Sequence, residues 1–199
     1  NGITMCKILK EDVRTSHIPI ILLTAKDSLQ DKEEGYQVGA DSYLTKPFSA
    51  TLLHSRINNL LESRKRLTER FNTSTPHHNM DEKRALLAES LNKLDNEFIE
   101  KINQLIEARL SSEKIDIGYL ADNMCMSKST LYRKMKALTG LSTNEYVRKI
   151  KMQHAERLLL EGRYNISEVA FRVGINSVVY FRQCFKEEFG VLPSEYLKQ

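Results

Sequence analysis

The sequence predicts a mostly α-helical chain, in which a partial α/β unit precedes an all-α domain of two helix-turn-helix units joined by a long central helix. Three observations carry this prediction. Residues 17–25 form a continuous apolar run, which is typical of a strand buried on both faces. Residues 142–162 carry both the start signal and the stop signal of one uninterrupted helix. One amphipathic pattern occurs before that helix and again after it.

The first 71 residues alternate between helical and strand patterns. Residues 1–16 begin with an amphipathic pattern, and 17–25 is the first expected strand. We expect a helix over 27–38 that ends at Gly39, a second strand over 41–46, and a long helix over 49–71 capped by Ser49. Because two strands rarely stand alone, the open edge of the first strand should lead to strand pairing, a swapped dimer or local disorder.

A linker and a helical connector follow over 72–94. Residues 72–80 are polar, contain Pro76 and lack any periodicity, which indicates a linker. Helical patterning returns over 81–110, and its firmer apolar stripe, around Phe98 and Ile102, begins the last domain. The expected domains are therefore 1–71, 72–94 and 95–199.

The central helix has recognisable signals at both ends. Ser142 and Glu145 form a capping-box pattern, and Gly162 can adopt the left-handed conformation that ends a helix. Two apolar stripes run along it, so we expect other elements to cover it from two directions. One stripe comprises Val147, Ile150 and Leu158, and the other comprises Met152, Ala155 and Leu159.

The pattern on either side of the central helix is an internal repeat. At an offset of 49, Ile117, Leu120, Ala121 and Met124 correspond to Ile166, Val169, Ala170 and Val173. At an offset of 50, Leu131, Met135, Lys136, Gly140, Glu145 and Tyr146 correspond to Phe181, Phe185, Lys186, Gly190, Glu195 and Tyr196. The change of offset predicts one extra turn residue in the second copy. A short helix, a turn and a second helix form the helix-turn-helix pattern.

The positive charge lies in the repeat. The net charge is +4, and residues 113–199 carry 14 Lys and Arg against 10 Asp and Glu, whereas residues 1–112 carry 16 of each. The charge is densest at Lys128, Arg133, Lys134 and Lys136, a cluster that predicts a phosphate-binding surface on the second helix of the first copy.

Other composition features favour a cytoplasmic protein without metal or cofactor. Cys6, Cys125 and Cys184 are far apart, with neither metal-ligand spacing nor disulfide density, which fits a reducing compartment. The adjacent pair His77 and His78 has no other ligand nearby, so solvent exposure is the better interpretation. No apolar run approaches the ~18 residues of a membrane span.

Residues 1–71 resemble the C-terminal part of a response-regulator receiver domain. Thr24, Tyr43 and the pair Lys46 and Pro47 stand where that family keeps its switch threonine, its rotating aromatic residue and its lysine. The resemblance implies that Lys46 pairs with a phosphoryl oxygen, that Thr24 donates a hydrogen bond to another, and that a cis peptide precedes Pro47. The family's acceptor aspartate and acidic metal-binding pair have no counterpart here, so we expect no phosphoacceptor in this chain and no enzymatic activity.

Residues 95–199 resemble the DNA-binding domain of the AraC family at many positions of fixed spacing. The matching positions are 117–121, 127–135, Ala155, Leu158, Leu159, 166–174, Tyr180, Phe181, Phe185, Lys186, Phe189, Gly190 and 193–196. A receiver joined to this domain is similar to the output end of a hybrid two-component regulator. This implies double-stranded DNA as a partner, upstream receiver and kinase parts in the full-length protein, and leaves a membrane anchor of that protein open.

The faces of the two second helices select the candidate DNA contacts. Leu131, Met135 and Leu138 should face the first core, and Phe181, Phe185 and Phe189 the second. The candidates that remain are Ser127, Lys128, Ser129, Tyr132, Arg133 and Lys136 in the first copy, and Ser177, Val178, Val179, Arg182, Gln183 and Lys186 in the second. Val178 and Val179 fit either thymine methyl contacts or packing against the preceding turn.

Length and charge favour a transcription regulator that reads two adjacent major-groove segments. A helix of about 20 residues is roughly 30 Å long, close to the roughly 34 Å between successive major-groove faces of B-DNA. The alternative is a helical protein-interaction or phosphotransfer module without sequence-specific DNA binding.

Overall fold

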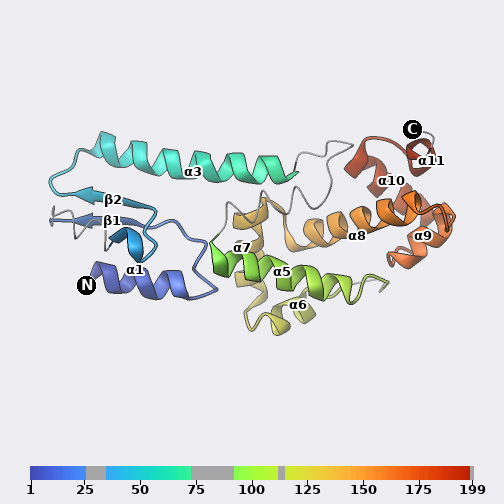
Figure 1. Ribbon diagram of the computed structural model, residues 1–199, viewed down its shortest axis with the longest axis horizontal. Coiled ribbons are helices and arrows are strands. Elements are labelled where there is room, and N and C mark those ends of the chain that lie inside the picture. Colours follow the sequence, from blue (N-terminus) through green and yellow to red (C-terminus); the bar gives the residue numbers. More distant parts are fainter. Residues whose placement is uncertain (26–34, 73–91, 112–114, 198–199) are drawn as a thin grey trace.

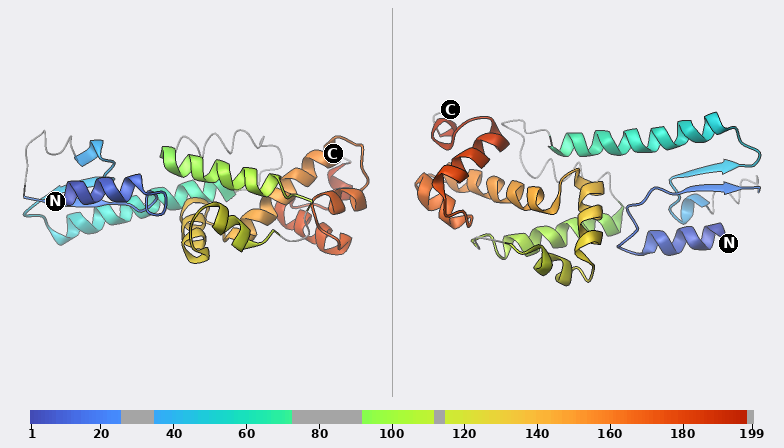
Figure 2. Two further views of the ribbon diagram at one scale, coloured as in Figure 1. Left: turned by 90° about the horizontal axis from the view of Figure 1, so that it is seen from below. Right: turned by 180° about the vertical axis from the view of Figure 1, so that it is seen from behind.

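The computed structural model describes residues 1–25, 35–72, 92–111 and 115–197, and it is elongated, with the two chain ends near opposite ends of the molecule (Figures 1 and 2). Residues 1–72 are the N-terminal part of the chain, and residues 115–197 are its repeat region. The helix expected over 27–38 falls mostly outside the described residues, as do His77, His78 and most of the expected linker.

The N-terminal part contains a two-stranded parallel sheet between helices. Its elements are α1 (Gly2–Glu11), β1 (Ile21–Thr24), β2 (Ser42–Thr45) and α3 (Ala50–Asn72). Ile21 pairs with Ser42 and Thr24 with Thr45, so both strands end at the same edge. Cys6, Leu22, Ala40 and Tyr43 form a small core.

One expectation for the N-terminal part needs correction. The first strand is shorter than 17–25, because His17 lies in a buried turn before the strand. On α3, the apolar residues Leu52, Ile57 and Leu61 are 44%, 39% and 57% exposed. The start of this helix agrees with the prediction, since the Leu52 amide donates to Ser49 Oγ at 3.1 Å.

The repeat region consists of two units of the same plan. The first unit is α6 (Ile117–Asn123), a turn and α7 (Lys128–Thr139), and the second unit is α9 (Ile166–Arg172), a turn and α10 (Val178–Phe189). α5 (Lys93–Glu107) packs on the first unit, and α11 (Pro193–Tyr196) follows the second. The first helices start 49 residues apart and the second helices 50 apart, as predicted, and the extra turn residue is Asn176.

α8 (Thr143–Leu160) joins the two units. Its capping box is present: the Glu145 amide donates to Ser142 Oγ at 3.3 Å, and the Ser142 amide donates to the Glu145 carboxylate at 2.7 Å. The two cores lie along its length rather than on two sides. Val147 and Ile150 belong to the first core, while Met152, Ala155 and Leu159 belong to the second. Leu158 packs on the second core and not with Val147, so that part of the stripe prediction is wrong.

Candidate nucleic-acid interface

The first unit presents the start of α7 to solvent. Ser127 caps the helix, because the Thr130 amide donates to Ser127 Oγ at 3.1 Å. The core face is formed by Leu131 and Met135, which are fully buried. The predicted contact residues of this unit are all exposed, namely Ser127, Lys128, Ser129, Tyr132, Arg133 and Lys136. An exposed, capped helix start with cations beyond it suits a phosphate backbone and base edges.

Lys134 does not belong to this basic surface, although its sequence neighbours do. Its side chain is fully buried, and its ammonium lies 2.5 Å from the Asp95 carboxylate of α5. Burial lowers the pKa of Lys134, and the hydrogen bond that its ammonium donates to Asp95 opposes that change. The phosphate-binding cluster predicted for α7 is therefore reduced to Lys128, Arg133 and Lys136. The sequence did contain a signal, since Lys134 stands three residues after the buried Leu131 and one turn before Leu138.

The second unit presents α10 in the same way. Ser177 caps it, because the Tyr180 amide donates to Ser177 Oγ at 3.2 Å. Val178 is half-buried against the second core, whereas Val179 is 77% exposed, so the two valines divide between packing and exposure. The other predicted contacts of this unit, Ser177, Arg182, Gln183 and Lys186, are exposed.

A chain of polar contacts links Gln183 to α8. Gln183 Nε2 donates to the Glu187 carboxylate at 3.1 Å, and Glu187 lies 3.5 Å from the Arg148 guanidinium of α8. Arg148 also bonds the hydroxyl of Tyr180, while the bond between that hydroxyl and Cys184 raises the pKa of Tyr180. Since a carboxylate only accepts, Glu187 fixes which end of the Gln183 amide faces it. Sequence reasoning missed Glu187 and Arg148, because nothing local pairs the two helices.

A second ion pair anchors α10 from its buried side. Lys149 of α8 lies 3.1 Å from the Glu188 carboxylate, and the two side chains are 5% and 19% exposed. Two residues further along α8, the buried Lys151 donates to the Gly174 carbonyl in the turn of the second unit at 3.2 Å. α8 therefore holds α10 and the turn of the second unit with charged side chains as well as with its apolar face.

Two of the three receiver-type residues, Thr24 and Lys46, meet at one edge of the sheet. Thr24 ends β1, and Lys46 follows β2 directly, with the Lys46 amide donating to the Thr24 carbonyl at 2.6 Å. Tyr43 is buried in β2, and the peptide between Lys46 and Pro47 is cis. Parallel strands bring their carboxyl ends to a common edge, so this is where the resemblance places a phosphoryl group.

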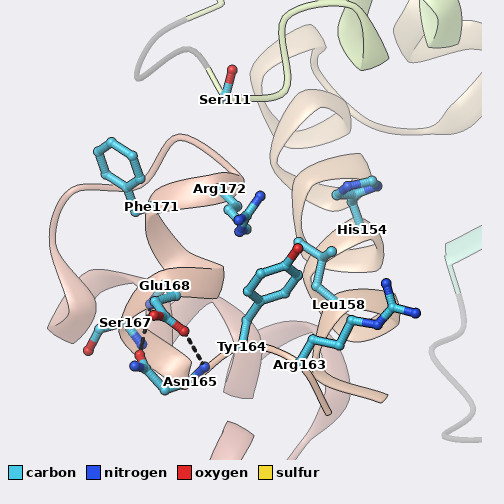
Figure 3. Close-up of a pocket in the computed structure, with 10 residues that line it drawn as sticks. All are labelled: Ser111, His154, Leu158, Arg163, Tyr164, Asn165, Ser167, Glu168, Phe171 and Arg172. Atoms are coloured by element: carbon cyan, nitrogen blue, oxygen red, sulfur yellow. Dashed lines mark hydrogen bonds between the residues drawn. The ribbon is translucent and has the colours of Figure 1, made fainter. Parts of the chain in front are cut away.

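A pocket of about 800 Å³ lies beside the second unit, between α8 and α9 (Figure 3). The Arg172 guanidinium stacks 3.8 Å from the centre of the Tyr164 ring, and Phe171 is 70% exposed at its rim. The Glu168 carboxylate accepts the Asn165 amide at 2.8 Å in the capping box of α9. Asn165 and Glu168 thus cap the start of α9, while Phe171 and Arg172 lie at its end.

Across the part of the chain that the structure describes, His, Cys, Asp and Glu nowhere gather in threes around a point that could hold a metal ion. None of the helices in the same part combines the length and apolar character that crossing a bilayer requires.

Comparisons with known families match both parts of the chain. Residues 1–58 match the family model of the response regulator receiver domain, and residues 120–199 match that of a helix-turn-helix domain. Histidine kinase P4 of Formosa agariphila is 35% identical over 195 residues, which are 98% of this chain and 14% of that protein. The DNA-binding dual transcriptional regulator Rns of Escherichia coli is 32% identical over 99 residues, 50% of this chain and 37% of that protein.

Among solved structures, the C-terminal domain of AraT, a response regulator from Geobacillus stearothermophilus, is similar with 31% identity and a TM-score of 0.47. The match covers 51% of this chain and 84% of that one. The chain spans only 14% and 37% of the length of the two curated relatives above. Residues 120–199 therefore form a helix-turn-helix domain, and residues 1–58 carry part of a response regulator receiver domain.

Proposed function

We propose that this chain is the DNA-binding output part of a two-component transcription regulator, and that each copy reads two adjacent major-groove segments. The supporting observation is that α7 and α10, equal in length at 12 residues, are held on one 18-residue helix. That helix is about 27 Å long at 1.5 Å per residue, close to one turn of B-DNA. A single chain then does what two subunits of a helix-turn-helix dimer usually do.

The twelve predicted contact residues divide into positioning and reading groups in this proposal. Lys136 and Lys186 occupy equivalent places one turn beyond Tyr132 and Arg182, and both are exposed. They neutralise phosphates, while Arg133 and Gln183 contact base edges, Val179 contacts a thymine methyl group, and the capped helix starts at Ser127 and Ser177 approach phosphates. The rest of the surface is Lys128, Ser129, Tyr132, Val178 and Arg182.

The N-terminal part receives the signal in this proposal. Thr24, Tyr43 and Lys46 respond to phosphoryl transfer at an acceptor supplied by upstream receiver and kinase parts, and the chain itself catalyses no reaction. We divide the chain into domains at 1–71, 72–94 and 95–199, and we place it in the cytoplasm, where its DNA would be. The exposed Leu52, Ile57 and Leu61 of α3 favour contact with a second copy or with those upstream parts.

Footprinting tests the two-segment proposal. After selection of a preferred duplex from a random library, one bound chain should protect two segments about one helical turn apart. Protection of a single segment by a monomer would contradict the proposal. A mobility shift at several salt concentrations separates DNA binding from a protein-interaction role, because phosphate contacts weaken steeply with salt.

Lys136→Ala and Lys186→Ala sharpen that test. Each change should weaken binding to all sequences alike and reduce the slope of log affinity against log salt by about one. Lys101→Ala, the same change at an exposed position of α5, serves as a control for general effects of surface charge. A sequence-dependent loss in either lysine variant would mean that the lysine reads bases.

A further inference from the structure

The buried ammonium of Lys134 is completed by the N-terminal part. An ammonium has three N–H donors, and three acceptors surround this one. Nζ lies 2.5 Å from the Val13 carbonyl, 2.8 Å from Ser16 Oγ and 2.5 Å from Asp95 Oδ1. Two of the three acceptors therefore come from residues more than 115 positions away in the sequence, outside the DNA-binding domain.

The acceptors are themselves held in place. Ser16 Oγ donates to Asp95 Oδ1 at 2.7 Å, and Asn92 Nδ2 donates to Asp95 Oδ2 at 2.9 Å and to the Ser16 carbonyl at 3.3 Å. Ser16 and Lys134 are fully buried, and Asp95 is 2% exposed. A buried charge pair is stable only with such additional hydrogen bonds, so removing one member leaves the others without compensation.

Apolar contacts accompany the polar ones. The side chain of Val13 packs against the core of the first unit, and the Lys134 ammonium lies 4.8 Å from the centre of the Phe98 ring of α5. α3 also contacts α7, and both views of the molecule show α7 beside the N-terminal part, whereas α10 lies at the far end (Figures 1 and 2). The segment 13–16 therefore contacts the first unit through side chains and backbone together.

The position of this contact connects it to both functional regions. Segment 13–16 lies between α1 and β1, and β1 ends at Thr24. On the other side, Lys134 directly follows Arg133 and lies two residues before Lys136, both of which remain exposed. The docked arrangement therefore leaves the predicted DNA-reading residues of α7 uncovered while it fixes the helix that carries them.

We propose that segment 13–16 is a docking element that holds the first recognition helix, through Lys134, in its DNA-reading orientation. The proposal rests on the proposed function, because α7 must read DNA for its orientation to matter. A signal that moves this segment withdraws two acceptors from Lys134 and loosens α7, while α10 keeps its own anchors on α8. The N-terminal part thus acts on one half of the operator and not on the other.

The experiment uses the full chain with Ser16→Ala, which removes one acceptor without adding bulk. Ser55→Ala, the same change at an exposed position of α3, is the matched control. Hydrogen exchange compares the amides of α7 with those of α10. Binding is measured on the selected duplex and on two derivatives, in which the base pairs protected by the first or the second unit are scrambled.

Ser16→Ala should speed exchange in α7 by about tenfold, since a hydrogen bond to a charged group is lost, and leave α10 unchanged. Scrambling the first segment should then cost the variant several-fold less affinity than it costs the unchanged protein, and scrambling the second segment should cost both the same. Ser55→Ala should match the unchanged protein in every measurement.

Equal acceleration in α7 and α10, or unchanged exchange together with unchanged half-site preferences, would overturn the proposal. Acceleration confined to α7 with unchanged half-site preferences would also overturn it, because docking would then not affect reading. If the unchanged protein bound no duplex at all, the proposed function would fail and the role in reading with it. Exchange in α7 would still report whether the docking contact exists.

Discussion

At equivalent places in the two recognition helices, α7 carries Lys134 and α10 carries Cys184, an offset of 50. Both side chains are buried, yet they have opposite chemistry. Lys134 needs acceptors and finds two of them in the N-terminal part, whereas Cys184 packs in an apolar core with Phe181 and Phe185. Two copies of one backbone plan therefore depend on different surroundings.

The difference separates a coupled unit from an anchored one. The first recognition helix is tied to α5 and to segment 13–16, and the second is tied to α8 through the pair of Lys149 and Glu188. A duplicated unit can thus keep its DNA-facing side while the buried side of one copy acquires a connection to another domain. Regulation need not alter the reading surface at all.

The largest expected effect comes from removing the buried cation. Lys134→Met leaves the Asp95 carboxylate buried and unpaired, which should lower the free energy of unfolding by about 3–5 kcal/mol. Cys184→Ala at the equivalent place should cost only about 1 kcal/mol, because it removes a small apolar group. Urea unfolding followed by circular dichroism measures both.

Adding Asp95→Leu to Lys134→Met should restore much of that loss, since an apolar pair replaces an ion pair of similar volume. Equal losses of unfolding free energy in Lys134→Met and Cys184→Ala would show that the two units do not differ in this way.

The next effect is a dependence on pH that belongs to the first unit. Burial lowers the pKa of His17 from 6.5 to about 4, and the nearby Lys134 contributes in the same direction. The unfolded chain then binds more protons than the folded chain between about pH 6.5 and 4, so stability falls as the pH is lowered through that window. The loss attributable to His17 should be on the order of 2 kcal/mol.

His17→Leu should flatten this part of the curve of unfolding free energy against pH. His154→Leu on α8 is the control, since burial also lowers the pKa of His154, whose charged neighbours are Arg157, Glu107 and Glu161 and not Lys134. Equal flattening in both variants would show that the pH dependence is not centred on the first unit.

The sequence predicted the repeat well because duplication leaves its signals in local patterns. The caps at Ser127 and Ser177 and the left-handed glycines Gly140 and Gly190 recur at one offset, and each acts within a few residues of itself. The burial of Lys134 was missed because the partners that make it tolerable are more than 115 positions away in one case and 39 in the other. The charge of Lys134 and the basic residues around it favoured an exposed side chain, whereas its helical spacing from Leu131 and Leu138 favoured a buried one.

The division of α8 between two cores was missed for a related reason. A helical wheel places Leu158 with Val147 and Ile150, but it contains no information on distance along the axis. Val147 and Leu158 are eleven residues apart, about 16 Å, which is enough to place them in different units. The start of β1 was missed as well, because the apolar run 17–25 does not show which of its residues pair with another strand.

Base preference should also differ between the units. Arg133→Ala and Gln183→Ala should each relax preference at one or two base pairs, at about 1–3 kcal/mol for the preferred base. A panel of single-base variants of the selected duplex measures this. If Arg133→Ala lowers every affinity by the same factor, the arginine positions the helix on phosphates instead.

Glu187→Ala distinguishes the second unit further. Glu187 orients the Gln183 amide from beside Arg148 of α8. Its removal should therefore reduce base discrimination about twofold, and only at the base pair that Gln183 reads. Ser16→Ala should leave that base pair unaffected, since the docking segment is bonded to Asp95 of α5 and to Lys134 of α7.

Another small effect concerns the turns. Cys125 has φ +53° in the first unit, and its counterpart Gly174 has φ +66° in the second. The left-handed conformation costs a residue with a side chain about 1–2 kcal/mol, and glycine escapes this cost but loses more freedom on folding. Cys125 is exposed, so Cys125→Gly sacrifices little burial and should stabilise the first unit by about 0.5–1 kcal/mol.

Gly190→Ala provides the reverse change at φ +79°, where an added Cβ meets nothing within 4 Å and only the conformational cost of about 1 kcal/mol remains. Hydrogen exchange should show slower exchange in α7 for Cys125→Gly and faster exchange at the end of α10 for Gly190→Ala. If Cys125→Gly destabilises the chain, the conformation of that turn depends on the cysteine side chain, and the two turns are not equivalent.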